Sequence, residues 1–275
     1  MSRPARAIRS GAFAAGALPA AAAAIWRGRG VRVLTYHRID DLPGDRLGVS
    51  PGIFRTHLKT IRDRGYRVVT LDDLLDAPAA ARPPDSPRLV ITFDDGYRDW
   101  YDNAFPILQE FSYPGVFFLT VGLVDGSAEI PRYRTLAAER RRALTPGQIA
   151  DMAGAGMRFE SHGVTHREMP ALSPGERNGE LKESARKIAE WTGRAPGWFA
   201  FPRGKYVPEM IGELRGAGYR GAVTVDPGSN VRFRGYPLVR RTEISADDSL
   251  CDFGFKLRGG ADFIHRLRRG RGEGS

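Results

Sequence analysis

Arg88-Leu-Val-Ile-Thr-Phe-Asp-Asp-Gly96 has the composition of a buried β-strand that ends at two carboxylates. Its apolar run is rich in β-forming residues, is too short for a helix and is closed by a glycine. Asp94 and Asp95 therefore lie at the carboxyl end of a strand, where parallel α/β sheets place their chemistry. Neighbouring carboxylates repel each other, so the pair favours a bound cation, although an Asp-Gly turn followed by a capped helix explains the same residues.

Short β-rich segments alternate with helical patterns along the rest of the chain. This alternation is typical of a parallel sheet or barrel. The first strand is expected at Val31–His37 and the last at Tyr236–Arg241. We predict an α/β fold, a distorted or incomplete (β/α) barrel with about seven parallel strands. No glycine-rich phosphate loop follows the first strand, which argues against a dinucleotide-binding fold.

The length of 275 residues suits one large domain or two small ones, and both ends of the chain are basic. We expect the domain at residues 31–262 and a disordered basic tail at residues 263–275. Residues 1–30 hold five arginines and no acid around an Ala-rich segment. They fit a signal peptide or an uncleaved arm on a membrane surface better than a spanning helix, which needs roughly 20 apolar residues. The protein is thus expected at the cytoplasmic face of a membrane, or exported if residues 1–26 are a signal peptide.

The net charge of +10 comes mostly from arginine. Such a charge suits an acidic polymer, a membrane surface or nucleic acid. No basic stripe with interleaved aromatic residues occurs, so we expect no nucleic-acid partner. Peripheral membrane contact through the N-terminal arm stays open. The single cysteine, Cys251, excludes an internal disulfide framework and a cysteine zinc cluster.

A second polar group, Glu160-Ser-His-Gly-Val-Thr-His-Arg167, follows another predicted strand. His162 and His166 would share one face of a helix, but the Gly-Val-Thr sequence between them disfavours a helix, so a turn has to bring the rings together. Two neutral imidazoles and a carboxylate suit a divalent metal, most naturally zinc with an open position for water. The alternative is a pair of unrelated polar histidines.

A third group, Phe199-Ala-Phe-Pro-Arg-Gly-Lys-Tyr206, again follows a predicted strand. A Pro-X-Gly turn can direct a backbone N–H towards the strand ends, as an oxyanion hole requires. By itself this motif has little specificity.

Together these groups resemble the motifs of the polysaccharide deacetylases of the NodB-homology type, carbohydrate esterase family 4. Thr92-Phe-Asp-Asp-Gly96 matches the first signature of the family. His162-Gly-Val-Thr-His166 matches its His-Ser/Thr-x-x-His signature, with Gly163 where Ser or Thr is usual, and Pro202-Arg-Gly204 is similar to the third motif. The resemblance runs from about residue 31 to about residue 260 and implies a metal-dependent deacetylase on a distorted (β/α) barrel.

The resemblance also implies roles for individual residues. Asp95, His162 and His166 would hold the metal, with Zn²⁺ as the expected ion. Asp94 would be the general base for the attacking water, and the backbone N–H of Arg203 would help to hold the tetrahedral oxyanion. The implied reaction removes N-acetyl or O-acetyl groups from an amino-sugar polysaccharide or its precursor, so an acetylated glycan is the expected partner.

One departure from the family concerns the arginine that pairs with the base. In the family this arginine often begins the third motif, where this chain has Ala200. Arg203, Arg240 and Arg241 are candidates to replace it.

A second departure concerns the general acid. The late Leu-x-His motif that supplies it in the family is not recognisable, and His265 lies close to the predicted tail. His37, at the end of the first strand, is the candidate acid; a strand-end histidine bonded to the backbone is the alternative. These departures leave room for an impaired barrel that binds glycan. An amidase on a small non-sugar amide is a separate alternative within the same fold.

Overall fold

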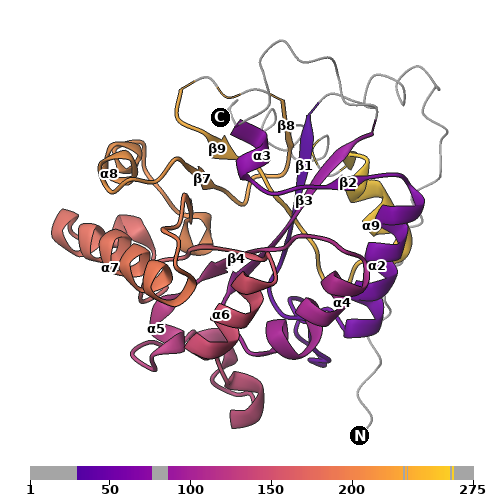
Figure 1. The fold of residues 1–275 in the computed structure, drawn as a ribbon, viewed down its shortest axis with the longest axis horizontal. Helices are drawn as coiled ribbons and strands as arrows, with labels where there is room; N and C mark the ends of the chain where they lie inside the picture. The colour runs from indigo at the N-terminus through magenta and orange to yellow at the C-terminus, as the bar shows by residue number, and fades with distance from the viewer. Residues whose placement is uncertain (1–29, 76–85, 232, 234, 261, 263–275) are drawn as a thin grey trace, which may run out of the picture.

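The computed structural model describes residues 30–75, 86–231, 233, 235–260 and 262. In this part of the chain one ten-stranded sheet curves into a nearly closed barrel, with helices packed around its outside (Figure 1). The predicted α/β barrel class is therefore confirmed. The predicted arm or signal segment, the predicted tail and His265 lie outside the described residues.

The strands follow the order β10-β1-β3-β4-β5-β6-β7-β9, and all neighbours on this path are parallel. β2 pairs in parallel with β3, and β8 is antiparallel to β1. The strands are β1 (Val31–Tyr36), β2 (Arg67–Val68), β3 (Arg88–Asp95), β4 (Val116–Leu119), β5 (Arg158–Ser161), β6 (Trp198–Ala200), β7 (Gly221–Val223), β8 (Ser229–Asn230), β9 (Leu238–Val239) and β10 (Thr242–Glu243).

The helices begin where the sequence offers caps. Ser50 caps α2, and the longest helix, α7, has a capping box of Ser173 and Glu176 and ends at Gly193, whose φ is 71°. The helices are α2 (Pro51–Asp63), α3 (Asp72–Leu75), α4 (Phe105–Glu110), α5 (Val121–Val124), α6 (Pro146–Gly154), α7 (Pro174–Thr192), α8 (Met210–Gly216) and α9 (Leu250–Leu257). None of the helices that the structure describes is both long and apolar enough to cross a membrane.

The segment before α4 differs from a plain α-helix. A π-helical turn covers Trp100–Ala104. Pro106 has no N–H to donate, so the hydrogen-bond ladder is already interrupted at this point and can widen. The wider turn buries the Trp100 side chain, whose indole N–H donates to the carbonyl of His37 at 2.7 Å.

β3 is buried on both faces, because outer helices cover one face and the barrel interior covers the other, while β1 and β4 pair with its edges. Leu89, Ile91 and Phe93 belong to a cluster that includes buried residues of α2, α4 and α6, so they face the outer helices. Val90 belongs to a second cluster with residues of β1, β4, β6, β7 and β9. Only the barrel interior can join so many strands, and the strand alternation therefore directs Thr92 and Asp94 inwards as well.

The barrel is not closed by a continuous hydrogen-bonded ladder. β9 pairs with β7 at one edge of the sheet and β10 pairs with β1 at the other, and only Arg240 and Arg241 connect them. The strand predicted at Tyr236–Arg241 is therefore too long. Asn230 bridges the opening, since its side chain accepts from the N–H of Arg240 and donates to the carbonyl of Val31.

His57 is a buried titratable group of α2, away from the strand ends. Its Nδ1 lies 3.1 Å from the hydroxyl of Tyr36, and its ring stacks on Phe253 with centroids 3.8 Å apart. Burial, assisted by the nearby charge of Lys256, lowers the pKa of His57 to about 4. The folded protein thus keeps this imidazole neutral.

This shift predicts a pH-dependent stability. The folded pKa lies below the unfolded value near 6.5, so the unfolded chain takes up the proton first as the pH falls. The contribution of His57 to the free energy of unfolding is then complete above about pH 6.5. It is lost as the pH falls towards 4, by about 3 kcal/mol at most. Urea unfolding between pH 7.5 and 5 should show a smaller loss for His57→Gln than for the wild type. Equal losses of unfolding free energy in the two proteins would contradict the lowered pKa of His57.

Candidate active site

The carboxyl ends of the parallel strands bring most of the predicted site residues to one end of the barrel. Because each strand contributes at the same edge, residues far apart in sequence meet there. The contributions are His37 after β1, Asp94 and Asp95 in β3, His162 and His166 after β5, and Arg203 after β6.

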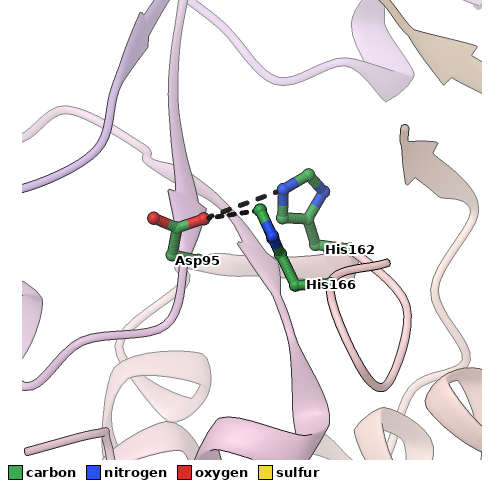
Figure 2. Close-up of side chains that lie close together, drawn as sticks. All are labelled: Asp95, His162 and His166. Carbon is green, nitrogen blue, oxygen red and sulfur yellow. Dashed lines mark ion pairs between the residues drawn. The ribbon is translucent and has the colours of Figure 1, made fainter. Parts of the chain in front are cut away.

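Asp95, His162 and His166 converge, as Figure 2 shows. The Nε2 atoms of the two histidines lie 3.8 Å (His162) and 3.4 Å (His166) from Oδ1 of Asp95. One candidate ligand atom from each residue lies within 4.8 Å of the others. Two imidazoles and a carboxylate are a common set of protein ligands for a catalytic zinc ion, so these residues fit the group that the sequence predicted.

The orientation of His162 is set by the strand beside it. Its Nδ1 donates to the carbonyl oxygen of Ala200 at 2.8 Å, which leaves Nε2 to face Asp95. Such a hydrogen bond fixes the tautomer of a ligating histidine. Burial lowers the pKa of His162 to about 4, although the neighbouring Asp94 opposes this, so the ring is neutral and able to act as a ligand.

Both carboxylates can serve one site only because the backbone departs from a regular strand. Alternation along β3 would direct Asp94 and Asp95 to opposite faces. Asp95 instead has φ 102°, and His166 has φ 58°, both in a region that non-glycine residues rarely adopt. Each such residue costs on the order of 1–3 kcal/mol and persists where its surroundings hold it.

Asp94 forms a buried bidentate ion pair with Arg241. Nη1 and Nη2 of the guanidinium donate to Oδ1 and Oδ2, each at 2.7 Å, and both side chains are 5% exposed or less. The arginine is held by the carbonyl of Thr224 at 3.1 Å and lies over the ring of Phe118. Burial acts to raise the pKa of Asp94, but the charge of Arg241, with smaller contributions from the site histidines, keeps it below the usual value.

Among the three candidates for the missing arginine, the structure places only Arg241 on Asp94. Arg240 is exposed. The Arg203 side chain is also exposed and lies 3.7 Å from Glu168. The backbone of Arg203 adopts φ 55° within the tight turn Pro202–Gly204. Because its side chain points to Glu168 at the surface, only the backbone of Arg203 is a candidate for a role in the site.

His37 is placed beside the two carboxylates. The register of β1 on β3 pairs Thr35 with Thr92 and Tyr36 with Phe93, so the next residue continues opposite Asp94. His37 also contributes to lowering the pKa of both Asp94 and Asp95. Its Nδ1 is buried and has no hydrogen-bond partner in the described part of the chain, which disfavours a ring bonded to the backbone through that atom.

A buried ion pair that the sequence did not indicate follows His37 directly. The Arg38 guanidinium binds Asp99, donates to the carbonyl of Arg140 and lies 4.2 Å from the ring centroid of Tyr97. It ties the first strand end to the Arg-rich segment of residues 125–144. In the sequence, the one feature that points to this ion pair is the position of Arg38 directly after His37.

Known proteins are similar to this chain in sequence and in fold. A family model described as polysaccharide deacetylase matches residues 81–222. YxkH of Bacillus subtilis strain 168, whose name places it among polysaccharide deacetylases, is 28% identical over 222 residues, which cover 81% of this chain and 74% of that protein. A poly-beta-1,6-N-acetyl-D-glucosamine N-deacetylase of Escherichia coli K12 is 30% identical over 106 residues, 38% of this chain and 16% of that protein. The structure of IcaB from Ammonifex degensii matches with a TM-score of 0.67 at 25% identity, covering 86% of this chain and 98% of that one.

The ion pair of Asp94 predicts a large effect of one substitution. Arg241→Met leaves a carboxylate buried without its partner, and we expect the free energy of unfolding to fall by about 3–5 kcal/mol. Arg240→Met changes the same residue type one position away on the surface and should cost less than about 0.5 kcal/mol. Chemical denaturation of the two variants measures both values. Similar losses in the two variants would contradict the role of the pair.

Proposed function

The chain belongs to the polysaccharide deacetylase family, and we propose that it uses a divalent metal to remove acetyl groups from an amino-sugar polysaccharide or its precursor. One observation carries the mechanistic part of the proposal. Asp95, His162 and His166 converge beside a second buried carboxylate, Asp94, which has its own cation in Arg241. A ligand set with a separate, ionised carboxylate next to it suits hydrolysis by an activated water.

The substrate class is proposed from the family and from its relatives. One relative is named for the polymer poly-beta-1,6-N-acetyl-D-glucosamine, which is an acetylated amino sugar. The family match supports deacetylation as the reaction. An amino-sugar polymer, or a precursor of one, is the substrate that both observations favour.

Each side chain has a defined part in the proposed reaction. A bound divalent ion, expected to be zinc, would polarise the acetyl carbonyl and make water more acidic. Asp94 is the general base, because it is ionised and Arg241 holds both of its oxygens in a fixed plane. His37 would protonate the leaving amine, and the backbone N–H of Arg203 would donate to the oxyanion.

The assignment of Asp94 as general base predicts a loss of activity in a variant whose folding is checked first, because Asn at this position leaves Arg241 without its carboxylate. Asp94→Asn removes the proton acceptor but keeps the shape of the side chain, so deacetylation should fall by about a hundredfold or more. Acetate release from N-acetylglucosamine oligomers measures this, with small non-sugar amides tested in parallel. The variant should still bind the metal. Near wild-type acetate release by this variant would exclude Asp94 as the base.

Metal content tests the ligand set without any assumption about the substrate. The wild-type protein should bind about one divalent ion per chain, as expected for a site of this type. The His162→Ala/His166→Ala double variant should lose the ion, and a chelator should abolish acetate release from the wild type in a way that added Zn²⁺ reverses. A folded wild-type chain that binds no metal would favour an impaired barrel that binds glycan.

A further inference from the structure

The turn that joins His162 to His166 contains several donors that meet one carboxylate from α7. Glu180 is buried, and its Oε2 accepts from the backbone N–H groups of Val164 at 2.5 Å and Thr165 at 3.1 Å. Its Oε1 accepts from the Thr165 hydroxyl at 2.5 Å. All three hydrogen bonds therefore come from residues between the two histidines.

Consecutive backbone N–H groups that point to one anion form a concave binding site, and here the anion belongs to the protein itself. The turn has no helical ladder to hold its shape, since Gly163 has φ 77° and His166 has φ 58°. The carboxylate of Glu180 supplies the acceptors that a helix would otherwise provide. This arrangement can hold His166 in its unfavourable backbone conformation.

Gly163 and Glu180 depend on each other. A Cβ atom at position 163 would lie 2.7 Å from Oε2 of Glu180, closer than real Cβ contacts allow. The carboxylate thus occupies the space that a side chain at position 163 would need. This close approach explains why position 163 is a glycine, although Ser or Thr is usual at this position of the His-Ser/Thr-x-x-His signature.

The same helix supports the turn a second time. The hydroxyl of Ser184 bonds to the hydroxyl of Ser161 at 2.7 Å, and Ser161 in turn accepts from the N–H of Gly163 at 3.1 Å. On the other side, the N–H of Val121 donates to the carbonyl of Gly163. The turn is therefore clamped between α5 and α7, and Glu180 provides the largest number of its side-chain hydrogen bonds.

We propose that Glu180 is a positioning residue of the candidate metal site, which holds the His162–His166 turn in the shape that lets both imidazoles face Asp95. This inference rests on the proposed function, because it concerns ligands of the proposed metal. Glu180 is not among the three candidate ligands, and its proposed action is through the turn. Residues that orient metal ligands typically change metal affinity by about 10–100-fold when they are removed.

Three variants separate this role from a general effect on folding. Glu180→Ala should weaken Zn²⁺ binding by about 10–100-fold. Glu180→Gln should stay within about threefold of the wild type, because the amide oxygen can accept both N–H groups while its NH₂ donates to the Thr165 hydroxyl. Glu213→Ala is the matched control, since that carboxylate also binds α7, through Arg177, but lies on α8 and touches no residue of the turn.

The measurement is Zn²⁺ affinity by competition with a chromophoric chelator, together with thermal unfolding of each metal-free variant. If Glu180→Ala does not fold, Thr165→Val replaces it in the test. This variant removes only the hydrogen bond from the Thr165 hydroxyl to Glu180 and should give a smaller loss of Zn²⁺ affinity. If Glu180→Ala and Glu213→Ala bind Zn²⁺ with the same affinity, the inference is overturned and the proposed function stays intact. Glu180→Gln as weak as Glu180→Ala would overturn it too, because charge would then matter rather than hydrogen bonding. A wild-type chain without metal affinity would overturn both proposals.

Discussion

The ion pair between Asp94 and Arg241 is the interaction on which the arrangement of this barrel depends. Asp94 lies one residue before the end of β3, and Arg241 lies where the chain crosses between the two unpaired edges of the sheet. Taking both charges out of water costs several kcal/mol per ion, which only close, bidentate contact can offset. The pair therefore has a fixed geometry, and it joins β3 to the opening in the barrel.

The pair also separates the two carboxylates chemically. Asp94 has a permanent cation, so its negative charge is balanced inside the barrel. Asp95 faces the imidazoles of His162 and His166, and its charge stays available for a divalent ion. Two adjacent residues of identical chemistry thus acquire different parts because their neighbours differ. Backbone strain at Asp95 is the cost of bringing both carboxylates to one side of β3.

The surroundings of the histidines follow the same logic. The carbonyl of Ala200 orients one ring, and the carboxylate of Glu180 shapes the turn that carries both. Each of these contacts comes from an element that is distant in sequence. The candidate ligands alone would not converge without this support, because two residues of their turn have positive φ.

Local patterns were sufficient for much of the fold. The apolar run before Asp94 identified β3. The starts of α2, α6 and α7 are written as locally, because each has a Ser or Thr cap followed by a proline at the first helical position. These features depend on residues close together in the chain, so the sequence shows them directly. The turn of Trp100–Ala104 was missed because its shape follows from the burial of a tryptophan against distant strands, as well as from Pro106. The strand at Tyr236–Arg241 was predicted too long because strand pairing at the opening, rather than composition, decides where it ends.

By itself, the sequence determined the barrel class, the family and the three polar groups at the strand ends, because each is written in short motifs and in the alternation of strands and helices. Only the tertiary structure decided which arginine neutralises Asp94, since Arg203, Arg240 and Arg241 are equivalent in composition and differ only in where the barrel places them. It also brought Glu180 to the turn of His162 and His166, and the 14–18-residue separation between them gives no local signal of this contact. Contacts between distant residues depend on the path of the chain through space, and no local pattern carries that information.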